Sequence, residues 1–184
     1  VYGLPEVNRE RIKKATKLAN PGCFATAIQI GLLPLAAAGL LKNEIHTNGI
    51  TGSTGAGVKP GATSHFSWRN NNISIYKAFT HQHLIEIGMT IRNLQPSFDK
   101  DINFLPVRGD FSRGIYVSQY TECDLDEELL GETERPNGMG RLQAPQVQGN
   151  GQRQVGPRST TLVINEGFNG KNVSTESVTK EEET

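Results

Sequence analysis

The apolar residues of this chain form blocks with two kinds of spacing, separated by Gly, Pro and Asn. Runs with apolar residues three or four apart predict helices, and short alternating runs predict strands. Helices are expected at 9–18, from Cys23 or Phe24 to 41 with a kink at Pro34, at 83–94, and at 124–130. Strands are expected at 45–51, 73–78, 102–107 and 115–122. The pattern therefore predicts a mixed α/β domain.

Cys23 lies where the first long helix is expected to begin. Pro21 and Gly22 interrupt whatever precedes them, and the residues that follow are rich in Ala, Leu and Ile. The first turn of a helix has unpaired backbone N–H groups and a partial positive charge, which favour a thiolate over a thiol. Two interpretations remain open: Cys23 is a nucleophile, or it is a small buried apolar residue, as most free cysteines are.

His81 and His83 stand at the polar start of the 83–94 helix. A thiol nucleophile needs an imidazole that takes its proton and later returns it. Two residues apart, the histidines share a face of an extended segment but diverge by about 200° on a helix, so only one is expected to point at Cys23. A zinc site would need a further ligand that the spacing does not supply, and a purely structural role stays open. We predict no metal.

Five sequence motifs carry a resemblance to a known family. They are YGLPE at 2–6, ANPGCFAT at 19–26, GSTGAG at 52–57, the His-x-His-x-x-Glu-Ile run at 81–87 and PVRGDFSRGI at 106–115. In this order the motifs resemble the N-acetyl-gamma-glutamyl-phosphate reductase family, which belongs to the semialdehyde dehydrogenase superfamily. The resemblance covers about residues 1 to 130. It implies a mixed sheet with helices on one face, of the semialdehyde dehydrogenase catalytic-domain type.

The resemblance implies an NADP-dependent enzyme of arginine biosynthesis. Cys23 would attack the acyl carbon of N-acetylglutamyl phosphate, and the resulting thioester would be reduced to N-acetylglutamate semialdehyde. His83 is the favoured acid/base, and His81 would contact the substrate or support the site. The expected substrate-binding residues are Asn20, Thr26 and Arg113, and the expected cofactor-binding residues are Ser53, Gly55 and Gly57. Arg108 is expected to be solvated or structural.

The chain is predicted to divide at residue 130. Residues 1–130 are expected to form the catalytic and dimerisation domain, without the glycine-rich Rossmann unit that would bind most of the NADP. Residues 131–184 are rich in Gln, Gly, Asn, Arg, Thr and Glu, with one strand-like run at 160–164. We expect much of this polar tail to be disordered or irregular, because it has few apolar residues to offset its ordering entropy.

The amino-acid composition limits the classes of binding partner that we expect for this chain. Lys plus Arg and Asp plus Glu number 19 each, so nothing in the net charge favours nucleic acid or a membrane surface. Two distant cysteines are typical of a reducing cytoplasm. The expected partners are a small-molecule substrate and further copies of this chain. Two other interpretations stay open: a catalytically silent dimerisation module or fragment, and an unrelated thiol hydrolase that uses Cys23 and a histidine.

Overall fold

One mixed β-sheet organises the part of the chain that the structure describes. The computed structural model describes residues 1–59, 61–123, 160–166 and 173–179. Its strands are β1 (Ile45–Thr51), β2 (Ser74–Ile75), β3 (Ile102–Arg108), β4 (Ile115–Cys123), β5 (Thr160–Glu166) and β6 (Val173–Thr179). They lie in the order β2-β3-β1-β4-β5-β6. Only the β1/β3 pair is parallel among the described pairs, and the others are antiparallel.

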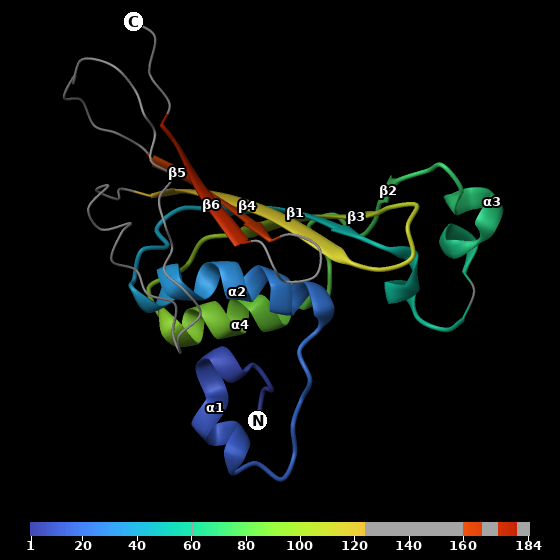
Figure 1. Cartoon of the computed structure of the whole chain (residues 1–184). Coiled ribbons are helices and arrows are strands. Elements are labelled where there is room, and N and C mark those ends of the chain that lie inside the picture. The colour runs from blue at the N-terminus through green and yellow to red at the C-terminus, as the bar shows by residue number, and fades with distance from the viewer. Residues whose placement is uncertain (60, 124–159, 167–172, 180–184) are drawn as a thin grey trace, which may run out of the picture.

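The two long helices cover a single face of this sheet (Figure 1). They are α2 (Cys23–Ala37) and α4 (His83–Leu94), which pack side by side. α1 (Pro5–Lys13) lies beyond them, on the side away from the sheet. Three short helices, η1 (Ser53–Ala56), η2 (Ala62–Ser64) and α3 (Phe66–Arg69), belong to the connection from β1 to β2. This arrangement confirms the predicted fold class.

The hydrophobic core lies between the two helices and the sheet. Along β1, Ile45, Thr47, Gly49 and Thr51 are buried, because alternate residues of a strand point to the same face. The helices contribute the rest of this core. Its largest fully buried side chains include Phe24, Ile28, Leu32 and Leu35 of α2, Ile87 and Ile91 of α4, and Phe104 of β3. Each such side chain contributes about 1.5–3 kcal/mol to stability through burial.

The helix α2 ends at Ala37, four residues earlier than predicted. Gly39 adopts a φ of 72°, a left-handed conformation that glycine accepts most readily. The Leu40 N–H then donates to the Leu35 carbonyl at 2.9 Å, and the Gly39 N–H donates to the Ala36 carbonyl at 3.1 Å. This is a Schellman motif, which pairs the last carbonyls of a helix. Pro34 stays inside the helix and is buried.

The predicted helix at 9–18 is wrong in its position. α1 begins at Pro5, whose fixed φ suits the first turn of a helix, and ends at Lys13. The chain then pairs with the amino terminus, since the Gly3 N–H donates to the Ala19 carbonyl and the Ala19 N–H to the Val1 carbonyl. That pairing requires an extended backbone before Ala19, so the helix cannot continue to residue 18.

The other predicted elements agree with the structure to different extents. The predictions at 45–51, 83–94, 102–107, 115–122 and 160–164 are confirmed by β1, α4, β3, β4 and β5. The strand predicted at 73–78 shortens to β2, because Lys77 and Phe79 adopt φ values of 46° and 58° that a strand does not accommodate. β6 was not predicted. The helix predicted at 124–130, the division at residue 130 and most of the tail lie outside the described residues.

Replacing Gly49 by Ala should destabilise the fold. A Cβ atom at this position would lie 2.5 Å from Cε1 of Phe24 and 2.9 Å from Cε2 of Phe104, and both rings are buried. Overpacking of this kind costs about 1–3 kcal/mol, measurable by urea unfolding. Gly61→Ala is the control, because its new Cβ would approach nothing closer than 3.8 Å. Equal unfolding free energies for the two variants would show that the core can rearrange to accommodate a methyl group at Gly49.

Candidate active site

The amino ends of α2 and α4 meet near the carboxyl ends of the parallel strands β1 and β3. Phe24, in the first turn of α2, packs against Gly49 of β1 and against the ring of Phe104, with ring centroids 5.0 Å apart. His81, just before α4, also contacts Phe104, at 5.4 Å between centroids. The carboxyl edge of parallel strands is where α/β proteins commonly bind ligands.

Cys23 is the first residue of α2, and its side chain is exposed. The prediction that a helix begins at this cysteine is confirmed, and the interpretation of Cys23 as a buried apolar residue is wrong. The backbone N–H groups of Cys23, Phe24 and Ala25 have no acceptor among the described residues, as expected for the first turn of a helix. The sulfur therefore lies beside donors that can hold a developing negative charge.

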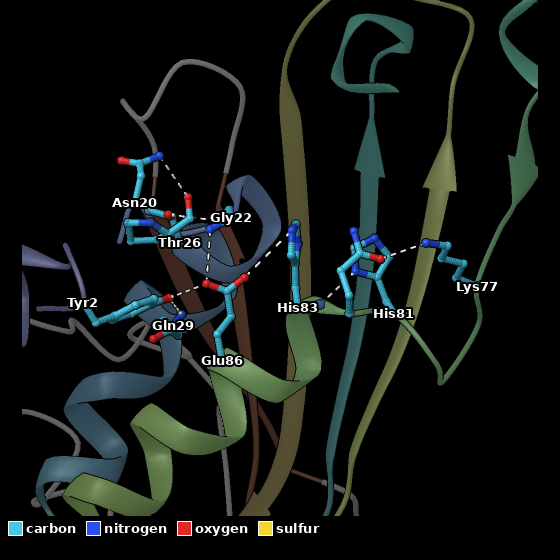
Figure 2. A network of polar contacts seen from close by, with 11 residues as sticks. Tyr2, Asn20, Gly22, Thr26, Gln29, Lys77, His81, His83 and Glu86 are labelled. Atoms are coloured by element: carbon cyan, nitrogen blue, oxygen red, sulfur yellow. Dashed lines mark hydrogen bonds and ion pairs between the residues drawn. The ribbon is translucent and has the colours of Figure 1, made fainter. Parts of the chain in front are cut away.

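His83 lies directly against Gly22, the residue that precedes Cys23 (Figure 2). A Cβ atom on Gly22 would lie only 2.2 Å from Nε2 of His83, so this approach requires glycine. The side chain of His83 is 14% exposed, and its Nε2 lies 3.9 Å from Oε1 of Glu86. Its Nδ1 is buried and has no hydrogen-bond partner in the described part of the chain. The structure thus brings His83 next to the cysteine segment.

His81 occupies a different environment. It is 5% exposed and contacts the rings of Phe24, Tyr76 and Phe104. Its Nδ1 accepts the backbone N–H of His83 at 3.3 Å, so the proton of the neutral ring is on Nε2. This hydrogen bond provides an acceptor for a backbone N–H that has no partner within the first turn of α4.

Burial keeps both imidazoles neutral. It lowers the pKa of His81 to about 4, with further contributions from His83 and Lys77. Burial also lowers the pKa of His83, and Glu86 opposes this shift. Desolvation disfavours the charged form of a histidine, so both rings are neutral at neutral pH.

A network of hydrogen bonds holds Glu86 beside His83. Its Oε2 accepts the phenolic O–H of Tyr2 at 2.8 Å and the backbone N–H of Gly22 at 3.2 Å. The amide of Gln29, a fully buried residue, donates to the Tyr2 oxygen at 2.8 Å. Burial raises the pKa of Tyr2 to about 12, and Glu86 contributes to the rise. This network joins the amino terminus, α2 and α4, as Figure 2 shows.

Sequence analysis did not identify Glu86, Tyr2 or Gln29 as functional residues. Glu86 belongs to the His-x-His-x-x-Glu run, and that spacing was the available signal. Tyr2 and Glu86 are separated by 84 positions. No local pattern connects residues that far apart.

Asn20 and Thr26, the predicted substrate contacts, lie near Gly22 (Figure 2). The hydroxyl of Thr26 donates to the Gly22 carbonyl at 3.0 Å, and the amide of Asn20 donates to the Pro21 carbonyl at 3.2 Å. Both side chains therefore support the backbone at the start of α2.

The 52–57 loop packs against the connection from β3 to β4. The hydroxyl of Ser53 donates to the Gly109 carbonyl at 3.4 Å, and the backbone of Arg113 lies against Gly52. Gly57 adopts a φ of 92°, and no atom lies within 4 Å of the place where its Cβ would stand. The Arg113 side chain is exposed. The structure does not bring Ser53, Gly55, Gly57 or Arg113 into contact with Cys23 or the histidines through any described hydrogen bond.

The described residues contain neither a metal-binding cluster nor a membrane-spanning helix. No group of three or more His, Cys, Asp or Glu side chains is arranged there to hold a metal ion. None of the helices described has both the length and the apolar character needed to cross a bilayer.

Comparisons with known proteins agree with the motif resemblance. Residues 23–133 match the family model described as semialdehyde dehydrogenase, dimerisation domain. The chain is 64% identical over 126 residues to a Parabacteroides distasonis protein and 67% identical over 126 residues to an Azobacteroides pseudotrichonymphae protein, both named N-acetyl-gamma-glutamyl-phosphate reductase. These matches cover 68% of this chain but only 39% and 38% of the relatives, so the chain spans about two fifths of their length.

The fold also resembles solved semialdehyde dehydrogenases. Aspartate semialdehyde dehydrogenase II from Vibrio cholerae, complexed with ASA, aligns with a TM-score of 0.51 and 16% identity, covering 72% of this chain and 48% of that one. A probable aspartate-semialdehyde dehydrogenase from Pseudomonas aeruginosa aligns with a TM-score of 0.51 and 14% identity, covering 72% of this chain and 47% of that one. At these identities the likeness supports the fold alone.

The buried His81 should make stability depend on pH. An unfolded histidine takes up its proton near pH 6.5, whereas folded His81 does so near pH 4. Between these values the unfolded state binds more protons, so stability falls as the pH drops from 6.5 to 4, by about 3 kcal/mol. Denaturant unfolding in this range should show a shallower pH slope for His81→Asn, which keeps an acceptor for the His83 N–H. An unchanged slope would mean that other groups control the acid sensitivity.

Proposed function

The chain belongs to the family of semialdehyde dehydrogenase dimerisation domains, and from this premise we propose that it carries the catalytic half of an N-acetyl-gamma-glutamyl-phosphate reductase. The reaction converts N-acetyl-gamma-glutamyl phosphate and NADPH into N-acetylglutamate 5-semialdehyde, phosphate and NADP. The names of the most similar relatives support this substrate. The observation that carries the proposal is the contact of His83 with Gly22, which puts an imidazole beside the segment of an exposed cysteine.

Cys23 is the nucleophile in this proposal. Its thiolate attacks the acyl carbon, a C–S bond forms, and the C–O bond to phosphate breaks as phosphate leaves with the electron pair. The unpaired N–H groups at the start of α2 stabilise the negative oxygen that develops on the acyl carbon. When the thioester has been reduced, the hemithioacetal collapses: its hydroxyl proton passes to His83, the C–S bond breaks, and the aldehyde and the Cys23 thiolate are released.

His83 is the acid/base. Because its ring is neutral at pH 7, it accepts the thiol proton before the attack and returns a proton to the hemithioacetal oxygen after reduction. Glu86, whose Oε1 lies 3.9 Å from Nε2, stabilises the imidazolium formed between these steps. His81 is a positioning residue in this scheme, since its Nδ1 accepts the His83 N–H and its ring packs against His83 at 4.5 Å between centroids.

The cofactor is proposed to be NADP(H), which when bound supplies the hydride that reduces the thioester. The 52–57 loop follows β1 and fits a ligand that approaches its backbone closely. Space is open at Gly57, and the nearest atom to a Cβ on Gly55 would be Thr51 Oγ1 at 3.5 Å. Ser53, Gly55 and Gly57 would form this contact. The described residues contain no strand, glycine turn and helix unit of the Rossmann type.

The chain is further proposed to form a homo-oligomer through the sheet face opposite α2 and α4. No described helix covers this face (Figure 1). It carries the half-buried side chains of Ile50, Leu105 and Val107, together with Tyr120, which is 41% exposed and stacks on His46 with ring centroids 4.8 Å apart. A cytoplasmic location is proposed from the free thiol of Cys23, because a reducing compartment preserves the nucleophile.

Reductase activity should depend on Cys23 and His83. The assay uses a chimera in which residues 1–123 of this chain replace the matching segment of the full-length Parabacteroides distasonis relative. Cys23→Ser should lower kcat by at least about 10³-fold, because a hydroxyl is a weak nucleophile at neutral pH, and His83→Gln by about 10²–10⁴-fold. NADPH oxidation with the acyl phosphate measures both. Cys123→Ser is the matched control and should keep full activity.

The alternatives give different results in the same experiment. A silent dimerisation module predicts an inactive chimera that still assembles. A thiol hydrolase predicts that this chain alone hydrolyses a thioester without nicotinamide and that Cys23→Ser abolishes this activity. Full activity of the Cys23→Ser chimera would refute the role of the sulfur.

Disrupting the open sheet face should change the oligomeric state. Tyr120→Asp places a charge in the face proposed to be covered by a second copy, and burying an unpaired charge is strongly unfavourable. Sedimentation velocity should show a dimer for the unmodified chain and a monomer for this variant. Ile85→Asp is the control, because Ile85 is 77% exposed on α4 and lies away from the sheet. Dissociation by Ile85→Asp rather than Tyr120→Asp would assign the contact to the helical side.

A further inference from the structure

Arg108, the last residue of β3, lies over the aromatic ring of Tyr76. Its guanidinium carbon is 4.5 Å from the ring centroid, within the range of a cation–π contact. Its Nη1 donates to the hydroxyl of Thr63 at 3.3 Å, and the Tyr76 side chain is a further hydrogen-bond partner of the guanidinium. Its Nε is buried without a partner in the described part of the chain. No described carboxylate forms an ion pair with it.

Arg69 shows what a purely structural arginine looks like in this region. It is 4% exposed, and all five of its N–H groups have acceptors. The acceptors are the carbonyls of Thr63, Asn72 and Arg108 and the hydroxyl of Ser74. Arg69 therefore fixes the backbone of Arg108 and of Thr63. It holds the backbone of Arg108 in place without using the N–H groups of the Arg108 guanidinium.

Tyr76 connects Arg108 to the cysteine site. The Tyr76 ring is 5.7 Å from the ring of His81, and His81 is 4.5 Å from His83, which lies against Gly22. Burial raises the pKa of Tyr76, Arg108 opposes this rise, and electrostatic interaction with Cys23 adds to it. Tyr76 is therefore within electrostatic reach of both Arg108 and the Cys23 sulfur.

We propose that Arg108 recognises an anionic group of the substrate at the Cys23 site. This inference rests on the proposed function, whose substrate carries two such groups, an α-carboxylate and an acyl phosphate. A guanidinium with unused N–H groups binds either of them in a bidentate manner, and the Tyr76 ring keeps its plane oriented. Arg108 thus takes the role that the sequence suggested for Arg113, whose side chain is exposed.

Alkylation of Cys23 tests this inference on the chain as it exists. Iodoacetate and iodoacetamide both transfer a two-carbon group to the sulfur with loss of iodide, but only iodoacetate is an anion. Cys123→Ser is used as the background, so that Cys23 is the one thiol labelled. Relative to a free thiol, Cys23 should prefer iodoacetate by about tenfold, because a charge-assisted hydrogen bond would hold the carboxylate of the reagent.

Arg108→Gln should abolish this preference while the rate with iodoacetamide stays unchanged. The neutral reagent serves as the check that Cys23 remains accessible in a folded variant. Arg108→Lys should retain part of the preference, since lysine keeps the positive charge but lacks the planar guanidinium that donates two parallel hydrogen bonds. Arg113→Gln is the matched control and should retain all of it. Loss of the preference in Arg113→Gln alone, or no preference in the parent chain, would overturn the inference.

Competing anions identify the group that Arg108 recognises. N-acetylglutamine, whose only anionic group is the α-carboxylate, should slow the reaction with iodoacetate if Arg108 binds that carboxylate. Inorganic phosphate should slow it if Arg108 binds the acyl phosphate. Either result must disappear in Arg108→Gln, and protection by neither anion would contradict the inference. Because alkylation needs no hydride transfer, failure of the reductase assay leaves this test unaffected.

Discussion

The close approach of His83 to Gly22 is the constraint on which the site depends. An imidazole can lie against the backbone one residue before Cys23 only because residue 22 has no side chain. The same glycine has an extended conformation, with φ −65° and ψ 153°, and is the N-cap of α2. Thus one residue both permits a helix to begin at the cysteine and admits the imidazole of His83. A larger residue would displace the side chains of His83 and Glu86 from this position.

The Glu86 network explains how this approach is maintained. The Glu86 carboxylate accepts the Gly22 N–H, while its other oxygen lies near His83, so one side chain bridges the two segments. Hydrogen bonds to a charged group contribute about 1.5–3 kcal/mol each, and the Tyr2 hydroxyl supplies a second one. Glu86 also lies in the first turn of α4, where the field of the helix favours negative charge. The carboxylate is therefore held from several directions.

How much the sequence could predict follows from the range of each interaction. The start of α2 at Cys23 depends on neighbouring residues, Pro21 and Gly22, and was predicted correctly. β1, β3 and β4 were recognised because alternation is a local property. The pairing of residues 1–3 with 17–19 is not local, and it displaced α1 from its predicted position. The contacts of Tyr2 with Glu86 and of Arg69 with Arg108 are also long-range, so the network around His83 and the support of Arg108 had no signal in the sequence.

The charged groups beside the imidazole pair lie on opposite sides of it. In the proposed reaction a thiolate and an anionic substrate repel each other, and two helix amino ends offset only part of that repulsion. Glu86 lies on the side of His83, where it favours the protonated ring, and Arg108 lies beyond His81, on Tyr76. His81, buried and neutral, separates these opposite charges and keeps them from forming a direct ion pair. If Glu86 and Arg108 met, the guanidinium would be neutralised and could not attract an anion to Cys23. The buried ring of His81 therefore keeps the cation available.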